Sequence, residues 1–223
     1  MAYALTFDDG PGPSTERLLD VLAKERVRAT FFVMGENTEG MRWGVSPKRA
    51  RGLVLRAMQE GHQIGNHSWF HFHPDANRIE PRLFVDEINR MDEFIRCLRL
   101  EVGLPVDDPI VLRLPYGAPC GSADPRPGLL AGLRRDHIMW TELFYDWDRP
   151  PAELIATNMS RHVSECVRSG KTAVLLLHDG CGDPHPDTHD RTPTVEAVEL
   201  FLSKARQEGN RWEATLSLPL CHG

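Results

Sequence analysis

Short apolar runs alternate along the chain with longer stretches in which apolar residues recur at three- and four-residue intervals. The short runs last about four to six residues, as buried parallel strands do, and the longer stretches are typical of amphipathic helices. The runs predict strands at Tyr3–Phe7, Ala29–Val33, Gln63–Asn66, Val111–Leu114, Ile138–Glu142, Thr172–Leu177 and Trp212–Leu216. Repeated β/α alternation of this kind favours a barrel of parallel strands, whose reactive groups collect at the carboxyl ends of the strands.

Two of the predicted helices have clear limits. One runs from about Arg82 to Leu100, where apolar side chains form a single stripe at helical spacing. The stripe consists of Phe84, Ile88, Met91, Ile95 and Leu98. A second helix begins near Thr192-Pro193, because proline is favoured in the first helical turn. Its apolar face comprises Val195, Val198, Leu202 and Ala205.

Composition narrows the class of protein. The 223 residues include 26 Lys and Arg against 32 Asp and Glu, which gives a net charge of −6, and no basic run is interleaved with aromatic residues. We therefore expect no nucleic-acid partner. No apolar run approaches the ~18 residues of a membrane span, so we expect no membrane contact. The chain contains no linker, which predicts one domain over residues 1–223.

The chain gives no sign of export. Its first distinctive residues follow the initiator Met so closely that a signal peptide has no room. The five cysteines (Cys97, Cys120, Cys166, Cys181 and Cys221) are odd in number and form no Cys-x-x-Cys pair, which fits reduced thiols better than a disulfide framework. Both observations predict a cytoplasmic protein, although a chain trimmed of its leader would show the same pattern.

Two adjacent carboxylates end the first predicted strand. Asp8 and Asp9 follow the apolar run and precede a Gly-Pro-Gly-Pro segment, which cannot continue a strand. Neighbouring side chains on a strand point to opposite faces, so the two acids serve one site only if the chain curls there, as the Gly-Pro turn would make it do. One acid could then bind a metal while the other handles a proton. Taken alone, the Asp-Asp-Gly-Pro segment is more simply a solvated turn.

Five short motifs in order favour a catalytic site instead. Thr6-Phe7-Asp8-Asp9-Gly10-Pro11 resembles the first motif of the polysaccharide deacetylases, which are carbohydrate esterase family 4 and carry the NodB-homology domain. The family's later motifs are similar to His67-Ser68-Trp69-Phe70-His71, Arg113-Leu114-Pro115-Tyr116-Gly117, Asp146-Trp147 and Leu176-Leu177-His178-Asp179. The resemblance spans nearly the whole chain. It implies a distorted (β/α)7 barrel with its active site at the carboxyl ends of the strands.

The resemblance implies a divalent metal held by Asp9, His67 and His71. Two imidazoles four residues apart can reach one cation if the loop turns helically, and three protein ligands leave positions open for water and substrate. The family usually has Pro directly after the second ligand His, which here selects His73. Spacing from His67 selects His71, which we favour because distance between ligands is what the metal senses. Zinc is the favoured ion, and cobalt, nickel or manganese would also be accepted.

The resemblance also implies roles for five further residues. Asp8 would be the general base, and Arg113 would hold it ionised and oriented. Tyr116 would offer its backbone N–H to the oxyanion. His178 would protonate the departing amine, with Asp146 as its partner.

The fourth motif is the least faithful to the family pattern Asp-x-x-Asp-Trp. Leu143 stands at its first position, with Glu142 adjacent, so either Glu142 substitutes for the acid or the role is absent. Aromatic residues gather near the same ends of the strands, where their faces suit stacking on a sugar ring, although some would equally pack beneath the loops. Among them we expect Tyr116, Trp147 and Trp69 to contact substrate.

These observations predict a metal-dependent hydrolase that removes an N-acetyl or related N-acyl group by means of metal-activated water. The expected substrate is an amino sugar, an oligosaccharide or a small biosynthetic intermediate. The alternative is an inactive barrel that serves as a carbohydrate-binding module, but neither a ligand nor the base is missing. A glycosidase using Asp8 and Asp9 is weaker, because adjacent side chains can hardly flank a scissile bond at the ~5–9 Å separation that such enzymes need.

Overall fold

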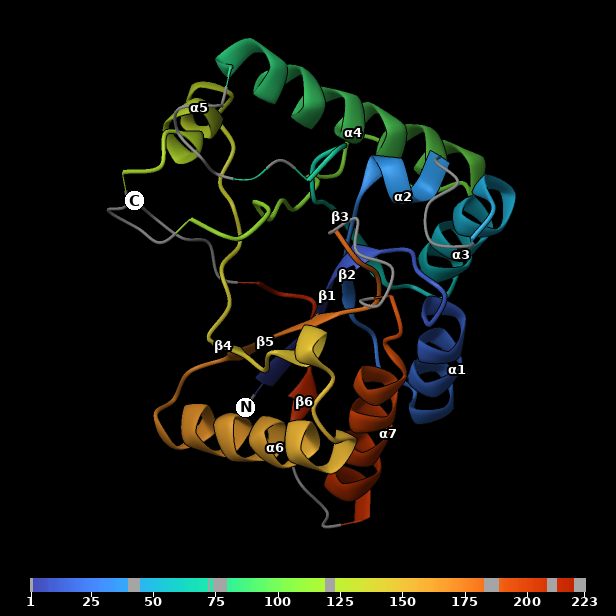
Figure 1. The fold of residues 1–223 in the computed structure, drawn as a ribbon, viewed down its shortest axis with the longest axis vertical. Helices are drawn as coiled ribbons and strands as arrows, with labels where there is room; N and C mark the ends of the chain where they lie inside the picture. Colours follow the sequence, from blue (N-terminus) through green and yellow to red (C-terminus); the bar gives the residue numbers. More distant parts are fainter. Residues whose placement is uncertain are drawn as a thin grey trace.

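The central strand of the structure is β1 (Ala2–Gly10), which lies between β2 (Thr30–Val33) and β5 (Ala173–His178) (Figure 1). The order β3-β2-β1-β5-β4 adds β3 (Gln63–Asn66) and β4 (Glu142–Leu143), and β6 (Glu213–Ala214) pairs with the first residues of β1. All of these pairings are parallel, as the apolar runs predicted. The structure is a computed structural model that describes residues 2–39, 45–71, 73, 80–118, 123–182, 189–207 and 212–218.

Extended backbone between β3 and β4 completes the ring of strands. Leu112 forms an isolated parallel bridge with Asn66, and the amide of Ile138 donates to the Leu112 carbonyl at 2.7 Å. The amide of Thr141 then donates to the Val174 carbonyl, beside the β4–β5 pairing. The predicted fourth and fifth strands therefore occupy their places, but they make too few successive hydrogen bonds to form regular strands before Glu142. The distortion of the predicted (β/α)7 barrel is concentrated in this part of the ring.

Helices follow the strands and cover the ring. In the described residues they are α1 (Thr15–Glu25), α2 (Gly35–Glu39), α3 (Pro47–Gln59), α4 (Pro81–Glu101), α5 (Arg126–Gly132), α6 (Ala152–Arg168) and α7 (Thr192–Gln207). The predicted helix from Arg82 is confirmed as α4, and its whole apolar stripe is buried. The helix predicted to begin near Thr192 is confirmed as α7. None of these helices is both long and apolar enough to cross a bilayer.

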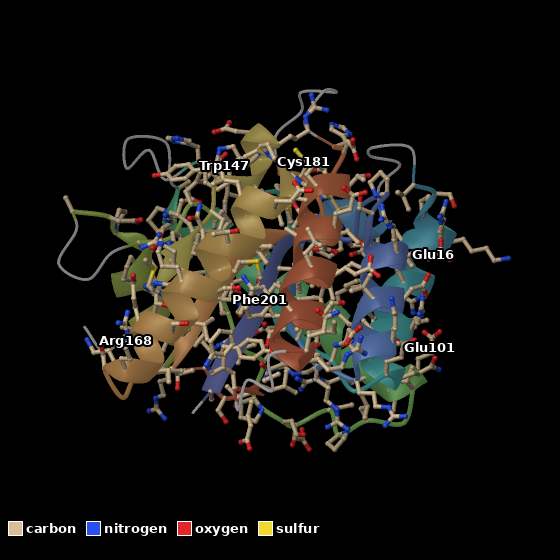
Figure 2. All side chains as sticks on the ribbon, turned by 90° about the horizontal axis from the view of Figure 1, so that it is seen from below. Glu16, Glu101, Trp147, Arg168, Cys181 and Phe201 are labelled. Carbon is tan, nitrogen blue, oxygen red and sulfur yellow. The ribbon has the colours of Figure 1, made fainter. Side chains whose placement is uncertain are left out.

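Side chains on β1 alternate between two environments. Leu5 and Phe7 belong to the hydrophobic core that the helices cover, whereas Thr6 and Asp8 contact the fully buried Arg113. The inside of the ring is therefore polar near the carboxyl ends of the strands. Figure 2 shows α6 and α7 side by side, with Trp147 and Cys181 near one end of the molecule and Arg168 and Glu101 toward the opposite end.

Candidate active site

A bulge at the end of β1 brings Asp8 and Asp9 into one cleft. Asp8 pairs with Phe32 and Gly10 with Val33, so Asp9 is an extra residue between the two pairs. Asp9 has a φ of 67°, in the left-handed region, and both carboxylates line the same cleft. We expected the change of backbone direction in the Gly-Pro turn, whereas the structure shows it at Asp9, within β1 itself.

The turn that follows requires glycine. A Cβ on Gly10 would lie 2.3 Å from Oδ2 of Asp179, and one on Gly12 would lie 2.6 Å from the Asp179 carbonyl. The Asp179 carboxyl accepts a hydrogen bond from Oγ1 of Thr15 at 2.5 Å, and burial raises its pKa to about 7. Asp179 therefore ties the end of β5 to the start of α1, and the missing glycine side chains allow this approach.

Asp9, His67 and His71 form a buried cluster with the donor set of a metal site. Oδ1 of Asp9 lies 3.3 Å from Nε2 of His67 and 3.1 Å from Nε2 of His71. One candidate ligand atom from each residue lies within 4.8 Å of the others. Oδ1 of Asp9 is buried without a hydrogen bond, which suits an atom that binds a cation. Two imidazole nitrogens and a carboxylate fit zinc or a similar divalent ion.

The protonation of the cluster also suits a cation. Nδ1 of His67 lies 2.8 Å from the carbonyl of Arg113, which can only accept, so the proton is on Nδ1 and Nε2 is left to bind metal. Burial would raise the pKa of Asp9, but the neighbouring imidazoles of His71 and His67 hold it well below its ordinary value. Asp9 is therefore a carboxylate at neutral pH.

His73 lies outside the cluster. Its exposed ring is 4.9 Å from the ring of Tyr116, whereas the ring of His71 is 5.1 Å from that of His67. The geometry thus favours the residue that the spacing from His67 selected, rather than the one that the neighbouring proline selected.

Separate replacement of His71 and His73 by Ala should distinguish the two candidates. We expect His71→Ala to weaken zinc binding by more than ~10²-fold, since even loss of a residue that only supports a ligand costs 10–100-fold. His73→Ala should leave zinc affinity unchanged. Competition with a chromophoric chelator would measure both affinities. Equal losses would contradict the choice of His71 over His73, and unchanged affinity in His71→Ala would show that the cluster is not the metal site.

Asp8 forms a buried ion pair with Arg113. Nη1 of Arg113 donates to Oδ1 of Asp8 at 2.8 Å, and Nε donates to the Ile138 carbonyl at 3.2 Å. Burial lowers the pKa of the guanidinium, and the Asp8 carboxylate opposes that effect. Oδ2 of Asp8 is directed to the histidine cluster, 3.7 Å from Nε2 of His67. One oxygen of Asp8 is thus held by a cation while the other faces the candidate metal site.

His178 ends β5 and is the pairing partner of Asp8 across the β1–β5 ladder. Its Nδ1 lies 2.8 Å from Oδ1 of Asp146, and its backbone N–H donates to Oδ2 of Asp146 at the same distance. The hydroxyl of Thr194 donates to Oδ2 as well. Burial would lower the pKa of His178, but Asp146 outweighs burial and raises it to about 9. The imidazole therefore carries a proton at neutral pH.

Tyr116 and Trp147, which we expected to contact substrate, both line the cleft. Tyr116 is 53% exposed, and its ring lies 4.7 Å from that of His71. The ring of Trp147, which belongs to the 3-10 turn η1 (Asp146–Asp148), is 5.3 Å from that of His178. Each of the two aromatic side chains therefore lies beside a histidine of the cleft.

Trp69, which we expected to contact substrate, does not line the cleft. Trp69 is only 4% exposed and packs in the core, with its ring 5.7 Å from Phe94 and the guanidinium of Arg90 3.5 Å from the ring centre. Ser68 has a φ of 65°, and this left-handed turn accompanies the placement of Trp69 against α4.

Glu142 does not take the place of the acid that the fourth motif lacks. Leu143 lines the cleft, whereas the Glu142 carboxylate lies outside it, 3.7 Å from Nδ1 of His162 on α6. Adjacent residues of β4 face opposite sides of the strand, so only one of them can face the cleft. In this chain that position is apolar.

The cleft has a volume of about 440 Å³. Its lining includes five residues that the sequence analysis did not single out as site residues: Trp140, Leu176, Cys181, Gly182 and Arg191. Arg191 is buried just before α7, and its Nε donates to the Gly180 carbonyl at 2.8 Å. A cation at the start of a helix opposes the helix dipole, and this unfavourable position is the feature of the sequence that distinguishes Arg191. Its charge, after the larger effect of His178, helps to lower the pKa of Asp146.

Comparison with known proteins gives a consistent result. Residues 2–124 match the family described as polysaccharide deacetylase. The chain is 33% identical over 213 residues to a chitooligosaccharide deacetylase of Bradyrhizobium sp. (strain ANU 289), covering 92% of this chain and 84% of that one. It is 30% identical over 210 residues to a peptidoglycan-N-acetylglucosamine deacetylase of Bacillus cereus, covering 94% and 84%.

Solved structures share the fold. A family 4 carbohydrate esterase from Streptomyces lividans, in complex with acetate, superposes with a TM-score of 0.68 at 24% identity, covering 96% of this chain and 92% of that one. A polysaccharide deacetylase from Bacillus cereus superposes with a TM-score of 0.65 at 27% identity, covering 95% and 89%. The first likeness concerns the fold alone.

Proposed function

Because the chain belongs to the polysaccharide deacetylase family, we propose that it is a metal-dependent hydrolase that removes N-acetyl groups from an amino sugar or oligosaccharide. One observation carries the proposal. Asp8 and His178 lie opposite each other on adjacent strands and line the same cleft as the Asp9, His67 and His71 cluster. A candidate base, a candidate acid and a candidate metal site thus share one small volume.

The metal would contribute the electrophile. A divalent ion held by Asp9, His67 and His71 would acidify a water molecule and polarise the amide carbonyl. Zinc is our first choice for this donor set, with cobalt, nickel and manganese as alternatives.

The remaining residues would handle protons and charge. Asp8, held at Oδ1 by Arg113, would accept the proton of the attacking water at Oδ2. The backbone N–H of Tyr116 would donate to the carbonyl oxygen as that oxygen becomes anionic. His178, whose Nδ1 is held by Asp146, would donate from Nε2 to the nitrogen as the C–N bond breaks. The products would be acetate and a free amine.

The substrate class is supported by the cleft and by the relatives. The exposed faces of Tyr116 and Trp147 suit the apolar face of a sugar ring. The matched relatives are named for chitooligosaccharides and for N-acetylglucosamine of peptidoglycan. An N-acetylated oligosaccharide is therefore the first substrate to test.

The decisive assay measures acetate release from N-acetylated chitooligosaccharides by zinc-loaded protein. Stoichiometric release of acetate and free amine would support the proposal. Saturable binding of the same sugars without any acetate release would instead identify a carbohydrate-binding module.

Replacement of Asp146 should change how the rate depends on pH. A general acid must be protonated, so kcat/KM falls as pH rises through the pKa of His178, which Asp146 raises. Asp146→Asn removes that negative neighbour, and we expect the alkaline limb of the profile to move to lower pH by about 1–3 units. The exposed Asp148 in the same turn provides the control, since Asp148→Asn should leave the limb in place. An unmoved limb in Asp146→Asn would separate Asp146 from the acid.

A further inference from the structure

Arg126, in the first turn of α5, is a buried arginine that does not line the cleft. It is 2% exposed, and its guanidinium donates to two backbone carbonyls. Nη1 donates to the Pro115 carbonyl at 2.8 Å, and Nη2 donates to the Gly117 carbonyl at 2.7 Å. These two residues flank Tyr116, so Arg126 holds the turn on both sides of the proposed oxyanion donor.

Asp124 fixes the guanidinium in place. Its Oδ2 accepts from Nη2 and Nε of Arg126 at 2.7 and 3.0 Å, and its Oδ1 accepts from the Arg126 backbone N–H at 2.9 Å. The planar fork of arginine spreads five donors over three nitrogens and so reaches a carboxylate and two separate carbonyls together, whereas the three donors of lysine all lie on one nitrogen. The contact therefore depends on arginine and not merely on positive charge.

The backbone that Arg126 holds is unfavourable on its own. Tyr116 has a φ of 61° and Gly117 a φ of 67°. Left-handed backbone at a tyrosine is energetically unfavourable and persists only where its surroundings enforce it. The amide of Gly117 donates to the Leu114 carbonyl at 2.8 Å, which closes the turn, and Arg126 holds the carbonyls on either side.

Peptide geometry links Arg126 to the Tyr116 N–H. The Pro115 carbonyl and the Tyr116 N–H belong to one planar trans peptide unit and point in opposite directions. Holding the carbonyl oxygen toward Arg126 therefore directs the N–H to the opposite side. A cation bonded to the carbonyl also polarises the peptide and strengthens its N–H as a donor.

We propose that Arg126 is a positioning residue that aims and polarises the Tyr116 N–H toward the oxyanion, an inference that rests on the proposed deacetylase function. The competing interpretation is that Arg126 only ties α5 to the preceding loop. The two interpretations differ in what they predict for binding of a tetrahedral anion.

The test compares Arg126→Met with the wild-type zinc enzyme. Complete loss of an oxyanion donor costs ~10²–10³ in kcat, so a misdirected donor should cost about 10–10². We expect KM for an N-acetylated chitooligosaccharide to change less than twofold and zinc content to stay the same. The inhibition constant of a methylphosphonamidate analogue, a tetrahedral anion, should rise by the same factor as kcat/KM falls. Arg126→Lys should recover part of the loss in kcat and part of the loss in inhibitor binding, because the lysine can still donate to one of the two carbonyls.

Arg99 provides a matched control. Its guanidinium also donates to two backbone carbonyls, those of Asp108 and Pro109, in a loop that does not line the cleft. Arg99→Met should lower thermal stability at most, without changing the binding of the phosphonamidate. If Arg126→Met also changes stability alone, Arg126 is a structural tie and the inference fails.

A measurement independent of activity separates this inference from the proposed function. The 15N–1H resonance and hydrogen exchange of the Tyr116 amide should change in Arg126→Met and not in Arg99→Met. If wild-type protein releases no acetate, the proposed function fails. If the resonance and exchange rate of the Tyr116 amide are also unchanged in Arg126→Met, then Arg126 does not position that amide and the inference fails as well. If wild-type protein is active and Arg126→Met has full activity, only the inference fails.

Discussion

Removal of divalent metal should abolish amide hydrolysis, and added zinc or cobalt should restore it. A metal that activates water and polarises a carbonyl supplies several kcal/mol, so we expect the rate to fall by at least ~10³-fold. Acetate release before and after exhaustive chelation would measure the loss, with metal content determined on the same samples. Full activity of verified metal-free protein would end the interpretation of Asp9, His67 and His71 as ligands.

Asp9→Asn should reproduce this loss genetically. An amide oxygen is a weaker ligand than the carboxylate that now faces both imidazoles, so zinc occupancy should fall. Asp20→Asn, on the exposed face of α1, should retain both zinc and activity. Excess zinc should partly restore Asp9→Asn, because the defect is one of binding.

Asp8→Asn should slow hydrolysis by about 10²–10⁴ while zinc stays bound. The substitution keeps the size of the side chain and removes the oxygen that would accept the proton of the attacking water. Rates measured at saturating zinc, with metal content and melting temperature on the same preparation, would separate loss of the base from loss of the ion or of the fold. Added zinc should not restore this variant.

The contrast between the two aspartates is the critical result. If Asp8→Asn and Asp9→Asn lose zinc equally, the assignment of separate roles is wrong. If both keep full activity, the cleft is not a hydrolytic site. Because Arg113 would lose its carboxylate partner in Asp8→Asn, some loss of stability is expected as well.

Sequence patterns predicted the framework well because they report local properties. The apolar runs located β1, β2, β3 and β5, and the stripe from Phe84 to Leu98 located α4. The family motifs also selected many of the residues that line the cleft, and they lie together because parallel strands bring their carboxyl ends to one side. The sequence predicted less well the segments that are held by isolated hydrogen bonds. One example is the segment around Leu112, whose pairing depends on backbone that is distant in the sequence.

The differences between prediction and structure have a common physical origin in the backbone. Trp69 lies within a motif that carries two cluster histidines, yet the left-handed turn at Ser68 accompanies its placement in the core. No sequence period reveals a single left-handed residue that is not glycine. Arg126 was missed for a related reason, because its importance lies in contacts with backbone carbonyls nine and eleven residues earlier.

The pairing of Asp8 with His178 across β1 and β5 has a consequence for how the family can diversify. Neighbouring strands are held about 4.8 Å apart by their ladder of hydrogen bonds. The strand pairing therefore fixes the backbone distance between the candidate proton acceptor and the candidate proton donor. Loops around the cleft can lengthen, shorten or change composition without altering that spacing. Evolution could therefore exchange the sugar that is recognised while the distance over which protons are moved stays constant.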